Sequence, residues 1–447
     1  MKNKLRTKSI PQVKTGAPAV IEESRLSHFP FVAGLLFAAV VWVLFCVFEY
    51  EYLFRVQELS LWLPTKVYFD ERMLVPGGLM AYVACFLTQF FYYPVLGSLI
   101  YVMLLLLVQW LAIKVFRVSA RHGLLALIPS ALILCCSMEA GYWIFQIKTQ
   151  GYFYSMLVGY LFTLSSIRLY QLVKGWLRYL IIIGVAALGY PFFGFYALLA
   201  LLVVALWTLR EGEEGKGGIT LLCVVSIIAT PILYYNVYAQ TRFVDMFTVG
   251  MPAFEFSKRD MFTWLPYILL YLYPLVMPFV PLGQGKDGIT KKSFFVEVAT
   301  VVAFIMTLGL FFWYRDPNFR AEIKMNHHME RLEWRKVLEV AKKQTQTPTR
   351  LIVLNKNLAL LKLGKAGDEM FHYLDGGEAP ESPLQIRLMQ VGGKMLYYHY
   401  ARMNFCYRWC LEDAVEYGWK IDYLKYMVRT SLVSGEPVLA QKYINTL

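Results

Sequence analysis

Long apolar runs recur through the first 314 positions of this 447-residue chain and constrain its fold more than any other feature. A helix of about 20 apolar residues matches the hydrocarbon thickness of a bilayer. A water-soluble globule cannot hide so much apolar surface, because 58% of the residues are hydrophobic and only 17% are charged. The sequence therefore predicts an all-α, polytopic membrane protein. The runs lie at residues 29–48, 78–93, 95–116, 123–138, 152–173, 177–190, 192–209, 218–238, 264–282 and 294–313.

The Lys and Arg residues between the runs predict how the chain is threaded. Loops rich in these residues stay in the cytoplasm, and strict alternation of all runs would leave most loop cations outside. The imbalance disappears if residues 77–93, a short segment that opens with Pro76-Gly77-Gly78, form an interfacial or re-entrant helix at the outer surface. We therefore expect about nine crossings. Two of these would be short helices joined by a turn at Gly189-Tyr190-Pro191.

The first 28 residues carry several Lys and Arg residues with scattered Pro and Gly, which predicts a disordered, basic cytoplasmic tail. The run at residues 29–48 is too long for a signal-peptide core and has no small-residue cleavage site at its end. We expect it to remain as a signal anchor. The transmembrane region would then extend from residue 29 to residue 314.

Two acidic loops accompany the first spans. Glu49-Tyr50-Glu51 follows the first run, in an outer loop at residues 49–94 that also contains Asp70. The surface helix VPGGLMAYVACFLTQFFYYP comes next, then the basic turn KVFRVSARH and the loop SMEAGYWIFQIKTQGYF, which contains Glu139. Over residues 1–175 this order resembles the GT-C superfamily of membrane glycosyltransferases. The PGGL…FLTQFFYYP stretch also resembles an uncharacterised bacterial family of polytopic proteins with a helical-repeat tail.

The GT-C resemblance implies transfer of a sugar from a polyprenyl-phosphate donor to an envelope acceptor, at the outer face of the bacterial inner membrane. It assigns Glu49 or Glu51 as the base that takes the acceptor's proton. A second acid for the acceptor or a divalent metal would be Asp70 or Glu139. The cations assigned to the lipid phosphate are Arg55, Lys148 and Arg242. That superfamily usually shows an Asp-containing pair in the first loop, whereas this chain has two glutamates, so catalysis and metal use stay open.

Each of these residues also has a simpler interpretation. Glutamates just beyond a span can be solvated loop residues, and Glu139 can be an interfacial residue beside Tyr142 and Trp143. Asp70 can pair locally with Arg72. Loop cations reach lipid headgroups without binding any substrate.

From Tyr314 onward the composition becomes that of a soluble helical domain, residues 315–447. The segment Asn357–Gly364 followed by Asp368–Tyr373 resembles the helix–turn–helix of a tetratricopeptide unit, and a second such turn is predicted at Ser431–Gly435. The chain stops within the amphipathic helix that follows, which suggests a truncated C-terminus. Such an outer helical region could bind a partner protein, so a non-catalytic membrane scaffold is the alternative to a glycosyltransferase.

Other motifs point away from further functions. No basic stripe with interleaved aromatics lies outside the apolar runs, which argues against nucleic-acid binding. Residues 283–288 match a GxGxxG pattern, but no strand precedes them, and we interpret them as a loop. His327-His328 lacks the spacing of a zinc site and is expected on a solvated helix face. Carboxylates and lysines are scarce within the runs, which disfavours an ion-coupled transporter.

Overall fold

A computed structural model of the chain describes residues 20–21, 28–211, 216–238, 242–252, 261–280, 289–376 and 389–447. The described residues are helical apart from loops and one antiparallel pair of two-residue strands, β1 (Val20–Ile21) and β2 (Ile289–Thr290). Most of the predicted tail and the whole of residues 283–288 lie outside the described residues. The all-α prediction is confirmed.

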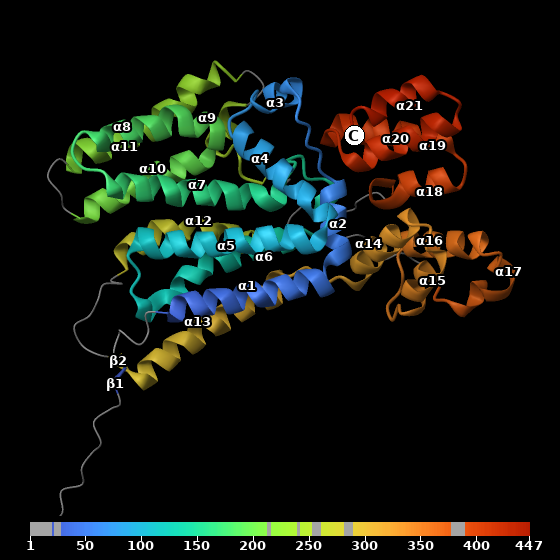
Figure 1. The fold of residues 1–447 in the computed structure, drawn as a ribbon, viewed down its shortest axis with the longest axis horizontal. Helices are drawn as coiled ribbons and strands as arrows, with labels where there is room; N and C mark the ends of the chain where they lie inside the picture. Colours follow the sequence, from blue (N-terminus) through green and yellow to red (C-terminus); the bar gives the residue numbers. More distant parts are fainter. Residues whose placement is uncertain are drawn as a thin grey trace, which may run out of the picture.

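The first part of the described chain is a bundle of long apolar helices that run side by side (Figure 1). Within the described residues, six helical segments are long and apolar enough to cross a membrane, which indicates a membrane protein. These six are α1 (Phe29–Val47), α5 (Pro94–Phe116), Ala120–Met138 (the 3-10 helix η3, Ala120–Leu127, with α6, Ile128–Met138), α11 (Lys216–Tyr235), Phe262–Phe279 (around α12, Leu265–Val276) and α13 (Lys291–Phe312). The helices α7 (Tyr152–Leu172) and α10 (Phe195–Glu211) also belong to the bundle.

Burial separates the central helices from the peripheral ones. In Ala120–Met138, 78% of the apolar window is buried inside the protein, whereas only 17% is buried in α13 and 22% in α11. The outward side chains of α13 are large and apolar, among them Phe295, Met306 and Phe311. A surface of this kind is stable against lipid chains and unstable against water.

The expected surface helix is α4 (Gly78–Gln89), extended to Tyr92 by one 3-10 turn, and it is shorter than the six long segments. It packs on α7 and is inclined to the long helices in Figure 1. Gly77 starts it in the left-handed region, with a φ of 83°, and the Gly77 amide donates to the Pro191 carbonyl at 2.8 Å. Gly151 permits the close approach to α7, because a Cβ there would lie 2.7 Å from the Cys85 nitrogen.

The predicted turn at Gly189-Tyr190-Pro191 is wrong. The helix α8 (Leu177–Gly184) continues through a π-helical turn at Val185–Gly189 into α9 (Tyr190–Phe193). Pro191 comes just after the π-helical turn, where the regular hydrogen-bond ladder of the helix is already interrupted. The chain turns at Gly194 instead, whose φ of 56° favours glycine, and α10 follows at once.

The C-terminal region, residues 313–447, lies beyond one end of the bundle, which we call the capped end (Figure 1). It forms two groups of helices. The first comprises α14 (Pro317–Glu330), α15 (Trp334–Lys342), α16 (Arg350–Lys362) and α17 (Ala366–Glu369). The second comprises the π-helical turn η11 (Met389–Gly393), α18 (Lys394–His399), α19 (Met403–Tyr417), α20 (Ile421–Val433) and α21 (Pro437–Ile444).

Both expected helix–turn–helix sites of this region contain a turn. Gly364 and Gly435 adopt φ values of 70° and 79°, with helices on either side. Their assignment as tetratricopeptide-like units stays a prediction. The expectation that residue 447 falls inside a helix is wrong, because α21 ends at Ile444 and Asn445 caps it.

Candidate functional site

Glu49 lies where the first span meets the capped end of the bundle. It is the N-cap residue of α2 (Tyr50–Glu58), and only 5% of its surface is exposed. Its Oε1 accepts a hydrogen bond from Trp313 Nε1 at 2.9 Å and forms an ion pair with the Arg320 guanidinium. Burial raises the pKa of Glu49 above its usual value, while Arg320 and Trp313 offset part of that rise. This is an acidic group held in place by the C-terminal region.

Glu49 and Glu51 share a small cavity with two cations. We call it the carboxylate cavity, and its lining includes Arg320 and Lys324 from α14. The positive charge of Lys324 also favours the ionised form of Glu49 and so acts to lower its pKa. The cavity holds about 20 Å³, which is room for a water molecule and far less than a sugar requires. The remaining lining residues are Phe48, Tyr52, Met138, Tyr314, Phe319 and Ile323.

Glu139 lies next to this cavity but does not line it. It caps the C-terminal end of α6 and is buried, and the preceding residue, Met138, does line the cavity. The Tyr314 amide donates to the Met138 carbonyl at 3.4 Å. Because Trp313 reaches Glu49 and Tyr314 reaches Met138, the start of the C-terminal region touches both acidic loops.

Three other predicted site residues lie elsewhere. Asp70, on α3 (Lys66–Arg72), is exposed, and so is Lys148. Arg242 is exposed too and pairs with Asp245 at 2.9 Å. None of the three lines the carboxylate cavity. The Asp70–Arg72 pair considered above does not form either, because the Arg72 guanidinium donates to Gln150 Oε1 at 2.6 Å.

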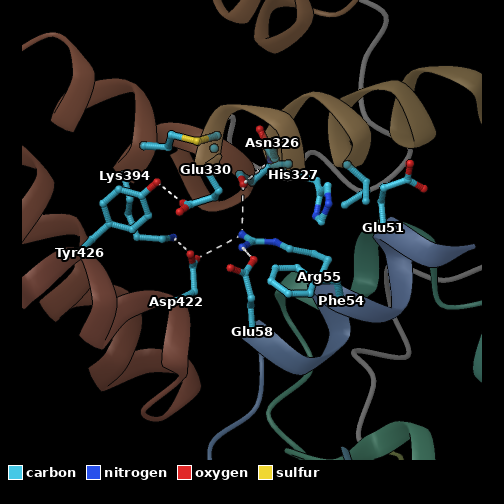
Figure 2. A pocket seen from close by; sticks show the side chains of 14 residues that line it. Glu51, Phe54, Arg55, Glu58, Asn326, His327, Glu330, Lys394, Asp422 and Tyr426 are labelled. Atoms are coloured by element: carbon cyan, nitrogen blue, oxygen red, sulfur yellow. Dashed lines mark hydrogen bonds and ion pairs between the residues drawn. The ribbon is translucent and has the colours of Figure 1, made fainter. Parts of the chain in front are cut away.

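Arg55, the remaining predicted phosphate ligand, is already occupied by carboxylates (Figure 2). Its Nη1 lies 2.9 Å from Glu58 Oε2 and its Nη2 lies 3.1 Å from Asp422 Oδ2. Burial alone would lower the pKa of Arg55, but Asp422 and Glu58 together raise it above its usual value. A guanidinium paired in this way links α2 to the C-terminal region and is not available to a lipid phosphate.

Arg55 belongs to a larger set of buried and half-buried charges, which we call the ion cluster. Lys394 pairs with Asp413 at 2.9 Å and lies 3.7 Å from Asp422, while Lys425 pairs with Glu58 at 2.5 Å. Its members are Arg55, Glu58, Glu330, Lys394, Asp413, Asp422, Lys425 and Arg429. Sequence reasoning missed it because Arg55 and Asp422 are 367 positions apart and no local spacing links them.

On α14, the prediction for His327 is wrong, and a second residue, Glu322, was not predicted. His327 is buried, not solvated, and its ring packs edge-on against Phe54 with centroids 5.0 Å apart. Burial lowers its pKa to about 4, so the ring is neutral at pH 7. Glu322 is buried as well, which raises its pKa to about 7. The spacing of Phe319, Ile323 and His327 along one helical face was the available signal that this face is covered.

Metal ligands do not gather in the described part of the chain. No group of three or more His, Cys, Asp or Glu side chains is placed there to hold an ion. The carboxylate cavity itself presents two carboxylates beside two cations.

A family model described as "Family of unknown function (DUF6057)" matches residues 26–447. The chain belongs to this family. The matched residues of this DUF6057 protein start just before α1 and include both acidic loops, the carboxylate cavity and the whole C-terminal region. Comparison with curated proteins and with solved structures finds no match.

Proposed function

We propose that this protein is a GT-C-type glycosyltransferase that moves a sugar from a polyprenyl-phosphate donor to an envelope acceptor. The carboxylate cavity supports this proposal by its set of charges and not by its size, because at about 20 Å³ it would have to open before a sugar could enter. It combines two carboxylates with two cations at the end of the first span, where a donor lipid would present its phosphate. The resemblance of the first 175 residues supplies the reaction class.

The cavity residues suit the two demands of such a reaction. The acceptor oxygen bonds to the anomeric carbon of the sugar while the bond from that carbon to the phosphate oxygen breaks, and the acceptor proton must go to a base. Glu51 is the better base, because Glu49 is engaged by Arg320 and Trp313. Arg320 and Lys324 would stabilise the negative charge on the leaving phosphate. They replace Arg55, Lys148 and Arg242 as phosphate ligands in this scheme.

The membrane arrangement is part of the proposal. About nine crossings would place the N-terminus in the cytoplasm of a bacterial cell and the capped end outside, with α4 lying along the outer surface. The shortness of α4 supports this threading, as does the distribution of Lys and Arg residues between the apolar runs. Both acidic loops would then face the outer side, where lipid-linked sugars are used.

The test is the surface-glycan profile of a deletion strain complemented with variants at matched membrane levels. The double variant Glu49→Gln, Glu51→Gln removes proton acceptance while keeping size, so we expect transfer to fall about 10²–10⁴-fold and glycans to be lost. Asp70→Asn is the matched control, because Asp70 lies in the same loop, is exposed and does not line the cavity. Normal glycans in the double variant would contradict the proposal.

A second candidate, the scaffold, is favoured by the outer face of the C-terminal region. Val415 on α19 and Val438 on α21 are 82% and 85% exposed, and Phe405 is exposed nearby in sequence. A contiguous exposed apolar patch is typical of partner-binding sites, and in the scaffold hypothesis these side chains would belong to one. If the double variant keeps normal glycans, this function becomes the better account, and Val415→Asp with Val438→Asp should then abolish partner capture.

A further inference from the structure

The C-terminal half of α2 is bound by charged and polar groups of α20. Arg55 reaches Asp422 at 3.1 Å, and Glu58 reaches Lys425 at 2.5 Å. Immediately after the helix, the Ser60 carbonyl accepts a hydrogen bond from the Ile421 amide at 3.3 Å. These contacts fix both the rotation of α2 about its axis and its height relative to α20.

The turn between α19 and α20 also contacts the second acidic loop. Lys420 Nζ donates to the Phe145 carbonyl at 3.4 Å, and Gln150 Nε2 donates to the Trp419 carbonyl at 2.6 Å. Gln150 in turn accepts from Arg72 at 2.6 Å. One turn of the C-terminal region therefore holds the two loops that carry the predicted acids.

Glu51 is coupled to this contact through α2 itself. It precedes Arg55 by four residues, so the two side chains lie one turn apart on the same face of the helix. Glu51 lines the carboxylate cavity and also the cavity around Arg55, whose lining is drawn in Figure 2. Any rotation of α2 that follows loss of the Arg55 pair therefore moves Glu51.

We infer that α20 and the turn before it position the acidic loop for the reaction, and that Arg55 is the positioning residue through which they act. This inference rests on the proposed function, because the group being positioned is the proposed base. Because buried ion pairs are poor sources of net stability, the role that we assign to the Arg55–Asp422 pair is to specify one register between α2 and α20. A reacting group displaced by about 1 Å can lose two orders of magnitude in rate, which is why such a register matters.

The first test measures amide hydrogen exchange in the full-length protein in lipid nanodiscs. Arg55→Gln should speed exchange about tenfold in both residues 53–58 and residues 421–433, because both sides of the contact lose their partner. Arg408→Gln is the control, since that exposed arginine pairs only locally with Glu412. Faster exchange in α20 with α2 unchanged would overturn the inference.

Asp422→Asn attacks the same pair from its other side and should reproduce the pattern of Arg55→Gln. Arg55→Lys keeps the charge and should restore part of the protection. If Arg55→Gln does not accumulate in membranes, Asp422→Asn and Arg55→Lys test whether the pair holds α2 against α20. Because Asp422 also lies 3.7 Å from Lys394, the comparison is made in α2, and different exchange of residues 53–58 in Arg55→Gln and Asp422→Asn would contradict a shared positioning contact.

The second test uses the glycan profile of the complemented deletion strain. Arg55→Gln should lower glycan output at least tenfold at matched membrane levels, and Arg55→Lys should recover part of it. Suppose that Arg55→Gln gives normal glycan output while the Glu49, Glu51 double variant loses glycans. The inference that Arg55 positions the base would then be wrong, and the proposed function would stand. If the double variant itself is normal, the proposed function fails, and the exchange experiment still decides whether α20 holds α2.

Discussion

The helical bundle and the C-terminal region bury different kinds of polar group. In the bundle, the buried polar side chains are mostly hydroxyls, such as Ser137 paired with Tyr101 at 3.0 Å. In the C-terminal region they include full charges, such as Lys394 paired with Asp413 at 2.9 Å. The difference follows from the surroundings, because a helix in lipid has no water nearby to share the cost of desolvating a charge.

The two kinds of burial meet at the capped end. Glu49, Arg55 and Glu58 follow the first span, and all three find their opposite charges in the C-terminal region. The capped end of the bundle thus contacts residues more than 260 positions later in the chain, as Trp313 and Glu49 show. Ion pairs therefore join the bundle and the C-terminal region at this end.

The largest expected effect is that of unpairing a charge in the C-terminal region. Lys394→Met leaves Asp413 buried without its partner, which should lower the free energy of unfolding by about 3–5 kcal/mol. Arg408→Met, which breaks an exposed pair, should change it by less than about 1 kcal/mol. Thermal unfolding in nanodiscs measures both. Equal effects would break the distinction between buried and exposed pairs.

A smaller effect of opposite sign is expected at Lys420. Burial, with Lys394 and Arg55 nearby, lowers the pKa of Lys420 to about 7, although Asp413 and Asp422 act the other way. The unfolded chain, with a pKa near 10.5 at this lysine, binds more protons between pH 7 and pH 10.5, so this lysine makes stability rise with pH across that window.

Lys420→Met should remove that rise and should stabilise the protein at pH 7 by about 1–2 kcal/mol. The measurement is the unfolding temperature at a series of pH values from 6 to 10, for wild type and variant side by side. An unchanged slope in the variant would show that Lys420 is not the titrating group.

The smallest effect is expected inside the bundle. Tyr101→Phe deletes one hydroxyl from the pair with Ser137 and should cost about 0.5–1.5 kcal/mol, as single hydrogen bonds between membrane helices do. Steric trapping or thermal unfolding in the same lipid would measure it. A loss as large as that of Lys394→Met would mean that hydroxyls and charges contribute alike, against the comparison above.

Sequence reasoning found the elements whose cause is local. Span length follows from bilayer thickness, and Pro76-Gly77-Gly78 marked the start of the short helix α4. It misplaced the turn at Gly194, because Pro191 is the more prominent local signal, whereas the folded chain passes Pro191 next to a π-helical turn and stays helical.

The candidate site was predicted only in part, for a similar reason. Glu49 and Glu51 follow the first span directly, so their place at its end could be foreseen. Arg320, Lys324 and the partners of Arg55 come from the C-terminal region, and only the folded chain brings them to the acidic loop. The GT-C resemblance therefore points to cations of the predicted outer loops, such as Lys148, whereas the folded chain brings cations of the C-terminal region to the cavity.

The central claim is that the acidic loops and the C-terminal region share the outer side of the membrane, and fusions to a periplasmic alkaline phosphatase reporter test it most directly. The account predicts high activity for a fusion after Leu447 and low activity for one after Arg210. The contact between Glu49 and Arg320 requires both to lie on one side. An inactive reporter after Leu447, with an active cytoplasmic reporter at the same position, would place the carboxylate cavity inside the cell and contradict the transferase proposal.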